Sequence, residues 1–366
     1  MDIVVLGLTI TSSWGNGHAT TYRALLRALS RRGHQVIFLE RDKPWYRDHR
    51  DMPSPPFCDT ILYQNLGQLK REHTRAIRRA DLVVVGSYVP EGIEVGRWVC
   101  SNASATAFYD IDTPVTLRKL AAGGCEYLAP ELIPCYDLYF SFTGGGTLDR
   151  LEQVYGSPRA RALYCSVDPT NYYPEGVESE YDLGYMGTYL ADRQPALQGL
   201  LVEPAQLWPS GRFVVAGPQY PGSIRWPANV TRIEHLAPSD HRRFYNKQRF
   251  TLNVTRADMR EAGYSPSVRL FEAAACGTPI ITDSWPGLDT IFDPQEEILV
   301  SHSPGQTLSY LRDMDEHHRR AVAHKARQRV LGNYTADHRA AEFEQHAYGL
   351  LGLSRKTVEV GFAENL

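Results

Sequence analysis

The sequence predicts an α/β protein with two domains, each built on a doubly wound parallel sheet. Three observations support this. Short apolar segments alternate with helical patterns over residues 1–165, a polar stretch containing prolines interrupts them at residues 166–182, and the same alternation then resumes. Alternating strands and helices favour parallel βαβ units, and a break between two such runs favours a domain boundary. A chain of 366 residues is long enough for two Rossmann-like domains.

The first run supplies the strands of the N-terminal domain. Each predicted strand is a short apolar segment rich in β-branched or aromatic residues. These segments are residues 3–6, 35–39, 60–63, 82–86, 105–109, 138–142 and 162–165. Helical patterns lie between most of them and are clearest at residues 18–32 and 147–155.

The second run has the same composition and supplies the C-terminal domain. Its predicted strands are residues 183–187, 212–217, 231–236, 249–254, 278–283 and 296–300. Helical patterns over residues 307–351 close the chain. We therefore predict an N-terminal domain at residues 1–168, a C-terminal domain at 169–345, and a helix end and tail at 346–366.

Composition excludes several classes of protein. The formal net charge of −3 gives no global bias towards nucleic acid or an anionic membrane. No apolar stretch approaches the roughly 20 residues of a membrane span, and the N-terminus lacks the basic region of a signal peptide, so a cytoplasmic location is predicted. The six cysteines are scattered without C-x-x-C. Neither a disulfide framework nor a zinc site is expected, and most of these cysteines are predicted to be buried.

The N-terminal segment has half of a dinucleotide-binding fingerprint: a strand, a glycine-containing loop, a helix, and a second strand ending in Glu40. In that fold the glycines follow the first strand at once. Here Gly15-Asn16-Gly17 comes eight residues after Gly7, and Thr20 stands at the third glycine position. These departures disfavour NAD or FAD. A long loop of small residues instead favours bringing His18 and backbone N–H groups to a ligand between the domains.

The segment "GYSPSVRLFEAAACGTPIITDSWPGLDTIF", residues 263–292, has the most specific pattern. Its first half predicts a helix with Ser267 as N-cap and Gly277 near the C-cap, followed by a strand. The free N–H groups at the start of this helix suit a phosphate. Glu272 lies one turn further on, where a carboxylate can accept both hydroxyls of a ribose. A solvated helix glutamate is the alternative, although the neighbours of Glu272 are apolar or small.

The segment "VRLFEAAACGTPIITDSWPGLDTIF" resembles the donor-site signature of GT-B glycosyltransferases. It is most similar to the CgeB-like (spore maturation protein) branch, whose members carry R-x-F-E-A-A-A-C-G here. "FTGGGTLDRLEQVYG", "SVDPTNYYP" and "DLGYMGTYLADR" extend the similarity over most of the chain. The resemblance implies two Rossmann-like domains facing across a cleft, a nucleotide-sugar donor bound by the C-terminal domain, and no cofactor.

The resemblance also implies a set of donor-binding residues. Glu272 matches the glutamate that binds the ribose, and a diphosphate calls for guanidinium groups and helix N–H groups. The predicted donor residues are Gly187, Thr188, Arg193, Arg256, Tyr264, Ser267, Arg269 and Glu272. For any one of these arginines, a surface role is the alternative. Tyr264 departs from the family: many retaining members have a glutamate eight positions before the ribose glutamate, so the E-x7-E pair is broken.

The N-terminal domain offers a general base. Inverting GT-B enzymes often use a first-loop histidine oriented by an aspartate after a later strand, which corresponds here to His18 with Asp110 or Asp112. The carboxyl ends of parallel strands line one crevice, so these groups are predicted to converge. Helix capping or contact with donor phosphate is the alternative for His18. Trp14, Asn16 and Gly17 are predicted to lie on the acceptor side.

"DID", residues 110–112, also spells the D-x-D of metal-dependent GT-A transferases, but so short a motif occurs often by chance, and no metal site is predicted. The predicted function is therefore metal-independent transfer of a sugar from a nucleotide donor to a small-molecule, glycan or protein acceptor, with inversion favoured. A retaining transferase, a nucleotide-sugar epimerase of the same fold, and a non-catalytic binding module remain alternatives.

Overall fold

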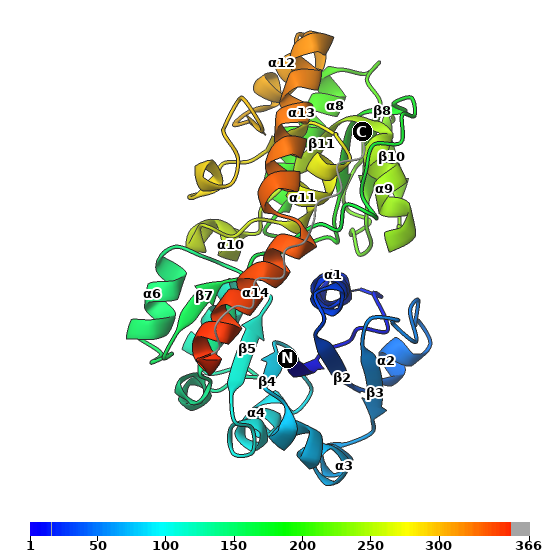
Figure 1. Ribbon diagram of the computed structural model, residues 1–366. Helices are drawn as coiled ribbons and strands as arrows, with labels where there is room; N and C mark the ends of the chain where they lie inside the picture. Colours follow the sequence, from blue (N-terminus) through cyan, green and yellow to red (C-terminus); the bar gives the residue numbers. More distant parts are fainter. Residues whose placement is uncertain (16, 353–366) are drawn as a thin grey trace.

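The computed structural model describes residues 1–15 and 17–352, which form two α/β domains placed one above the other (Figure 1). Each domain has one parallel sheet. The first sheet has the strand order β3-β2-β1-β4-β5-β6-β7, and the second has the order β10-β9-β8-β11-β12-β13. In both sheets the order reverses beside the first strand of the domain, which is where α/β proteins bind ligands. The predicted fold class, two Rossmann-like domains of GT-B type, is confirmed.

The N-terminal domain is built on seven strands. These are β1 (Asp2–Gly7), β2 (Gln35–Arg41), β3 (Asp59–Tyr63), β4 (Leu82–Gly86), β5 (Thr106–Asp110), β6 (Leu138–Ser141) and β7 (Ala160–Ala162). Its helices are α1 (His18–Arg31), α2 (Pro44–Arg47), α3 (Leu66–Arg79), α4 (Gly92–Cys100), α5 (Thr113–Ala121), the 3-10 helix η1 (Pro130–Cys135) and α6 (Gly146–Gln153).

The strands are apolar because both faces of the sheet are covered. In β1, Ile3 and Val5 pack into one core and Val4 and Leu6 into the other, and none is more than 2% exposed. Alternate side chains of a strand point to opposite faces, so a continuous apolar run indicates a strand buried on both sides.

The C-terminal domain repeats this plan with six strands. These are β8 (Tyr181–Met186), β9 (Phe213–Ala216), β10 (Val230–Ile233), β11 (Gln248–Asn253), β12 (Ile280–Thr282) and β13 (Leu299–Val300). Its helical segments are α7 (Gln194–Leu197), η2 (Gln198–Val202), α8 (Glu203–Leu207), α9 (Pro238–Asn246), α10 (Ala257–Ala262), α11 (Val268–Ala275), η3 (Leu288–Thr290), α12 (Pro304–Arg312) and α13 (Glu316–Asn333).

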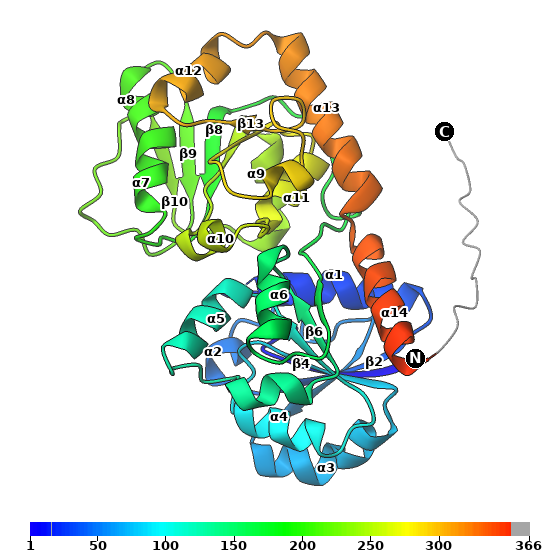
Figure 2. The ribbon, with the colours of Figure 1, turned by 90° about the vertical axis from the view of Figure 1, so that its left-hand side faces the viewer.

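The last helix, α14 (Ala336–Leu351), returns to the N-terminal domain (Figure 2). It packs against α1, and the Phe343 ring stacks on Phe140 of β6 with 5.1 Å between ring centroids. The sequence-based boundary at residue 345 placed most of this helix with the C-terminal domain. Its apolar face is instead buried by the first domain.

Two smaller expectations also differ from the structure. The strand predicted at residues 162–165 lies at Ala160–Ala162, because the chain then turns towards the second domain, where the Cys165 thiol donates to the Pro266 carbonyl at 3.3 Å. Only Cys165 and Cys276 among the six cysteines are buried. In the part of the chain that the structure describes, no helix combines the length and apolar character needed to cross a bilayer.

Candidate active site

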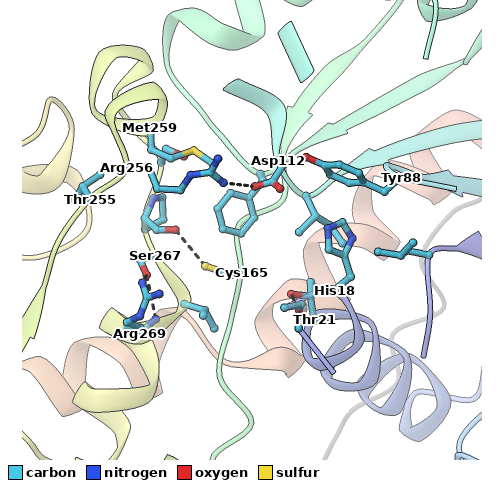
Figure 3. A pocket seen from close by; sticks show the side chains of 18 of the residues that line it. His18, Thr21, Tyr88, Asp112, Cys165, Thr255, Arg256, Met259, Ser267 and Arg269 are labelled. Carbon is cyan, nitrogen blue, oxygen red and sulfur yellow. Dashed lines mark hydrogen bonds and ion pairs between the residues drawn. The ribbon is translucent and has the colours of Figure 1, made fainter. Parts of the chain in front are cut away.

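Two adjoining cavities lie between the domains, next to the carboxyl ends of strands from both sheets. The first cavity has a volume of about 490 Å³ and the second about 360 Å³. Gly15, Gly17, Val268 and Arg269 line both. Figure 3 shows the first cavity, with His18, Thr21 and Tyr88 on one side and Arg256, Ser267 and Arg269 on the other.

Glu40 fixes the loop that leads from β1 into the cleft. Its carboxylate is fully buried and accepts hydrogen bonds from the Thr9 hydroxyl at 3.0 Å and the Thr11 hydroxyl at 2.6 Å. It also accepts the backbone N–H groups of Ile10 at 2.7 Å and Thr11 at 3.0 Å. Its oxygens are thus engaged inside the protein, which agrees with the rejection of a dinucleotide fingerprint.

His18 begins α1 and lines the first cavity. The imidazole is buried, packs against the Tyr88 ring with 5.3 Å between centroids, and its Nδ1 has no hydrogen-bond partner in residues 1–15 and 17–352. Burial lowers the pKa of His18, while the negative charge of Asp112 acts in the opposite direction. The imidazole is therefore neutral at neutral pH and can accept a proton.

The two aspartates of "DID" have different surroundings. Asp110 is fully buried at the end of β5, where it accepts hydrogen bonds from the Tyr139 hydroxyl at 2.7 Å and the Thr116 hydroxyl at 2.9 Å. Burial raises the pKa of its carboxyl to about 6. Asp110 does not line either cavity, so it is not placed to orient His18. Asp112, the N-cap of α5, lines the first cavity with His18.

Three arginines of the C-terminal domain line the first cavity. Arg256 pairs with Asp112 at 3.6 Å, and Arg269 donates to the Ser267 hydroxyl at 3.0 Å. Burial lowers the pKa of Arg193, and the positive charges of Arg269 and Arg256 add to this. Among the described residues, neither Arg193 nor Arg269 has a carboxylate within ion-pair distance. Arg260, on the neighbouring helix α10, lines neither cavity and lies 4.0 Å from Asp283.

Helix α11 presents its N-terminus to both cavities. The Ser267 side chain accepts the N–H of Arg269 at 3.4 Å, as predicted for an N-cap. Glu272, one turn further on, is only 3% exposed, lines the second cavity, and accepts a hydrogen bond from the Tyr245 hydroxyl at 2.9 Å. Gly187 and Thr188 line the same second cavity. The structure thus brings these predicted donor residues together.

Two predicted site residues do not lie where they were expected, and a third lies outside the residues that the structure describes. Tyr264 lines neither cavity; its backbone carbonyl accepts the N–H of Gly144 at 2.9 Å, and its ring packs between Gly145 and Gly287. Trp14 lines the second cavity beside Glu272, not the first, and stacks on His49 with ring centroids 4.2 Å apart. Gly17 lines both cavities, and Asn16 lies outside the described residues.

Sequence reasoning missed several cavity residues. From the N-terminal domain these are Tyr88 and Phe142, and from the C-terminal domain Thr255, Met259 and His235. All but Met259 lie within a few residues of the carboxyl end of a predicted strand. That position is the signal that identifies them, because parallel strands end at one crevice.

Comparison with known proteins agrees with this geometry. Residues 193–345 match the family model described as "Glycosyl transferase-like". Among curated proteins nothing matches. The solved structure of sucrose-phosphate synthase from Thermosynechococcus elongatus is similar, with a TM-score of 0.69 and 15% identity over 97% of this chain and 100% of that one.

Two further solved structures contain a bound nucleotide. An alpha-glucosyltransferase in complex with UDP-glucose and DNA containing an abasic site has a TM-score of 0.72 and 14% identity, over 95% of this chain and 99% of that one. Anabaena HepE in complex with UDP and glucose has a TM-score of 0.68 and 11% identity, over 95% of this chain and 100% of that one. Residues 193–345 are therefore similar in sequence to glycosyltransferases, and the whole chain has the GT-B fold.

Proposed function

We propose that this protein transfers a sugar from a nucleoside diphosphate sugar to an acceptor hydroxyl, without a bound metal ion and with His18 as general base. One observation carries the proposal. Arg193, Arg256 and Arg269 line the first cavity together, and Arg269, in the first turn of α11, also lines the second cavity with the buried carboxylate of Glu272. Like charges repel, so such a cluster favours the binding of an anion.

A nucleoside diphosphate suits both the positive arginines and the negative Glu272, because it has an anionic diphosphate and a ribose with hydroxyl donors. The arginines and the free N–H groups of α11 would hold the diphosphate and stabilise the negative charge that develops as the sugar leaves. Glu272 would accept the ribose hydroxyls from the second cavity. Two of the solved structures with this fold, HepE and the alpha-glucosyltransferase, contain UDP or UDP-glucose, so a UDP-sugar is the first donor to test.

His18 supplies the proton acceptor on the other side of the first cavity. The acceptor oxygen would attack the anomeric carbon while its proton passes to the imidazole, and the bond from that carbon to the phosphate oxygen would break with its electrons leaving on the diphosphate. The carboxylate of Asp112 would stabilise the imidazolium. Attack opposite the leaving group inverts the anomeric configuration.

The surroundings of Asp110 support a mechanism without a D-x-D metal. Both of its oxygens accept hydrogen bonds inside the domain, so they do not converge with Asp112 on a shared ion. Within the described residues, no group of three or more His, Cys, Asp or Glu side chains is placed to hold a metal. The cationic cluster would take the role of a metal at the diphosphate.

The N-terminal lining of the first cavity indicates the class of acceptor. Three aromatic rings and an apolar side chain line it, from Tyr46, Tyr88, Phe142 and Ile111. Among the described lining residues of that domain, Asp112 is the sole carboxylate, and there is no Lys or Arg. Aromatic rings stack on sugar faces, whereas nucleic acids need cations to bind phosphates. We therefore propose an uncharged acceptor, such as a saccharide hydroxyl, and not a nucleic acid.

A panel of UDP-, GDP- and ADP-sugars, followed by NMR, tests the proposal. Slow hydrolysis of one donor, and transfer when saccharide acceptors are added, is the expected result. Isomerisation of the donor sugar would indicate an epimerase. Binding of a nucleotide sugar without any turnover, with or without acceptors, would indicate a binding module and contradict the proposed transfer.

A further inference from the structure

One ion pair crosses the cleft inside the first cavity. Arg256, the N-cap of α10, lies 3.6 Å from Asp112, the N-cap of α5, measured from Nη1 to Oδ1 (Figure 3). Each side chain is 25% exposed, so solvent screens the pair only in part. The pair therefore joins a predicted donor residue to the one carboxylate among the described residues that line the first cavity with His18.

Both partners keep unused bonding capacity. The distance of 3.6 Å is longer than a hydrogen bond, and Arg256 Nε has no hydrogen-bond partner in the described part of the chain. The Asp112 carboxylate does not cap α5. A diphosphate offers several oxygens and more negative charge, and it can bind a guanidinium through two parallel hydrogen bonds. It would therefore compete successfully with Asp112 for Arg256.

We propose that the Asp112–Arg256 pair is a latch that donor binding opens. The inference rests on the proposed function. Without donor, Arg256 holds Asp112 on the donor side of the cavity; when the diphosphate takes Arg256, Asp112 is released to stabilise the imidazolium of His18. The base is then strongest after the donor is bound, which favours an order in which the donor precedes the acceptor.

If the latch exists, replacing Asp112 should increase the affinity for a nucleotide. Titration calorimetry of the full chain with UDP, GDP and ADP measures this affinity. Asp112→Asn should bind the preferred nucleotide about two- to fivefold more tightly than wild type, the range expected from a partly exposed ion pair. Asp258→Asn is the matched control: Asp258 pairs with Arg118 at 3.0 Å across the same α10–α5 contact but lines neither cavity. Its nucleotide affinity should equal that of wild type.

A double-mutant cycle separates the latch from simple repulsion between Asp112 and phosphate. Arg256→Gln alone should weaken nucleotide binding. In that background Asp112→Asn should give little or no gain, because the pair no longer exists. An equal gain with and without Arg256, or no gain in Asp112→Asn, would overturn the latch and leave the proposed transfer intact. Failure of wild type to bind any of the three nucleotides would overturn the proposed function and the latch with it.

Discussion

Replacing Glu272 tests the donor site most directly. In the structure its carboxylate is buried, already accepts the Tyr245 hydroxyl at 2.9 Å, and lines the second cavity. Hydrogen bonds to a charged group contribute about 1.5–3 kcal/mol. Glu272→Ala should therefore weaken binding of a nucleoside diphosphate by about 10- to 150-fold in Kd. Titration calorimetry with UDP, GDP and ADP is the assay.

Two further variants control for indirect effects. Glu272→Ala leaves the Tyr245 hydroxyl without its partner, so some loss of stability is expected and a thermal melt must show that the variant is folded. Glu272→Gln keeps the volume but removes the charge, and it should give an intermediate affinity. Tyr245→Phe removes the hydroxyl and keeps the carboxylate, so its nucleotide affinity should fall much less than that of Glu272→Ala, because the groups proposed to bind the ribose remain. A folded Glu272→Ala with unchanged affinity would refute the ribose role.

Three more predictions follow from the site. His18→Ala should lower kcat by about 10²–10⁴ with nearly unchanged nucleotide affinity. Because burial lowers the pKa of His18, the wild-type rate should stay level as the pH is lowered to below 6.5, and then fall as the imidazole is protonated. An NMR spectrum showing retained anomeric configuration in the product would contradict direct displacement by this base. Excess EDTA should leave turnover unchanged, whereas a loss restored by magnesium or manganese would contradict the metal-independent proposal. Glu40→Ala should lower the free energy of unfolding in urea by about 2–4 kcal/mol, because it leaves several buried donors unpaired. Glu40→Gln can still bond to the Thr9 and Thr11 hydroxyls, so its free energy of unfolding should fall much less. Equal losses of stability in the two variants would contradict this account of the loop.

The fold was predictable because its strands are buried on both faces. A strand such as β1 must be apolar along its whole length, and that pattern is visible without coordinates. The position of α14 was not predictable in the same way. Its apolar face fits either domain by composition, and the choice depends on Phe140 and α1, which are distant in sequence.

The candidate site was predictable where local structure fixes a side chain. Ser267 is the N-cap of α11 and Glu272 lies about one turn further on, so the cap and the helical period place them at the two adjoining cavities, Ser267 at the first and Glu272 at the second. The aspartates show the limit of this reasoning. Residues two apart on a strand share a face, but β5 ends at Asp110 and α5 begins at Thr113, so Asp112 leaves the sheet while Asp110 stays buried.

The contacts of the segment around Tyr264 help to set the distance between the domains, and the hydrophobic pattern of the sequence does not reveal them. Its backbone has a φ of 47°, and its ring fills space that Gly145 and Gly287 leave open: a Cβ at Gly145 would lie 2.3 Å from the ring and one at Gly287 2.5 Å. The next residue, Ser265, shares a 2.9 Å hydrogen bond with Thr143 of the N-terminal domain. Two residues later the chain reaches Ser267, the N-cap of α11. Residues 264–267 therefore contact the N-terminal domain and also set the position of α11, the helix proposed to hold the diphosphate. A change in the spacing of the domains would move the donor phosphates relative to His18.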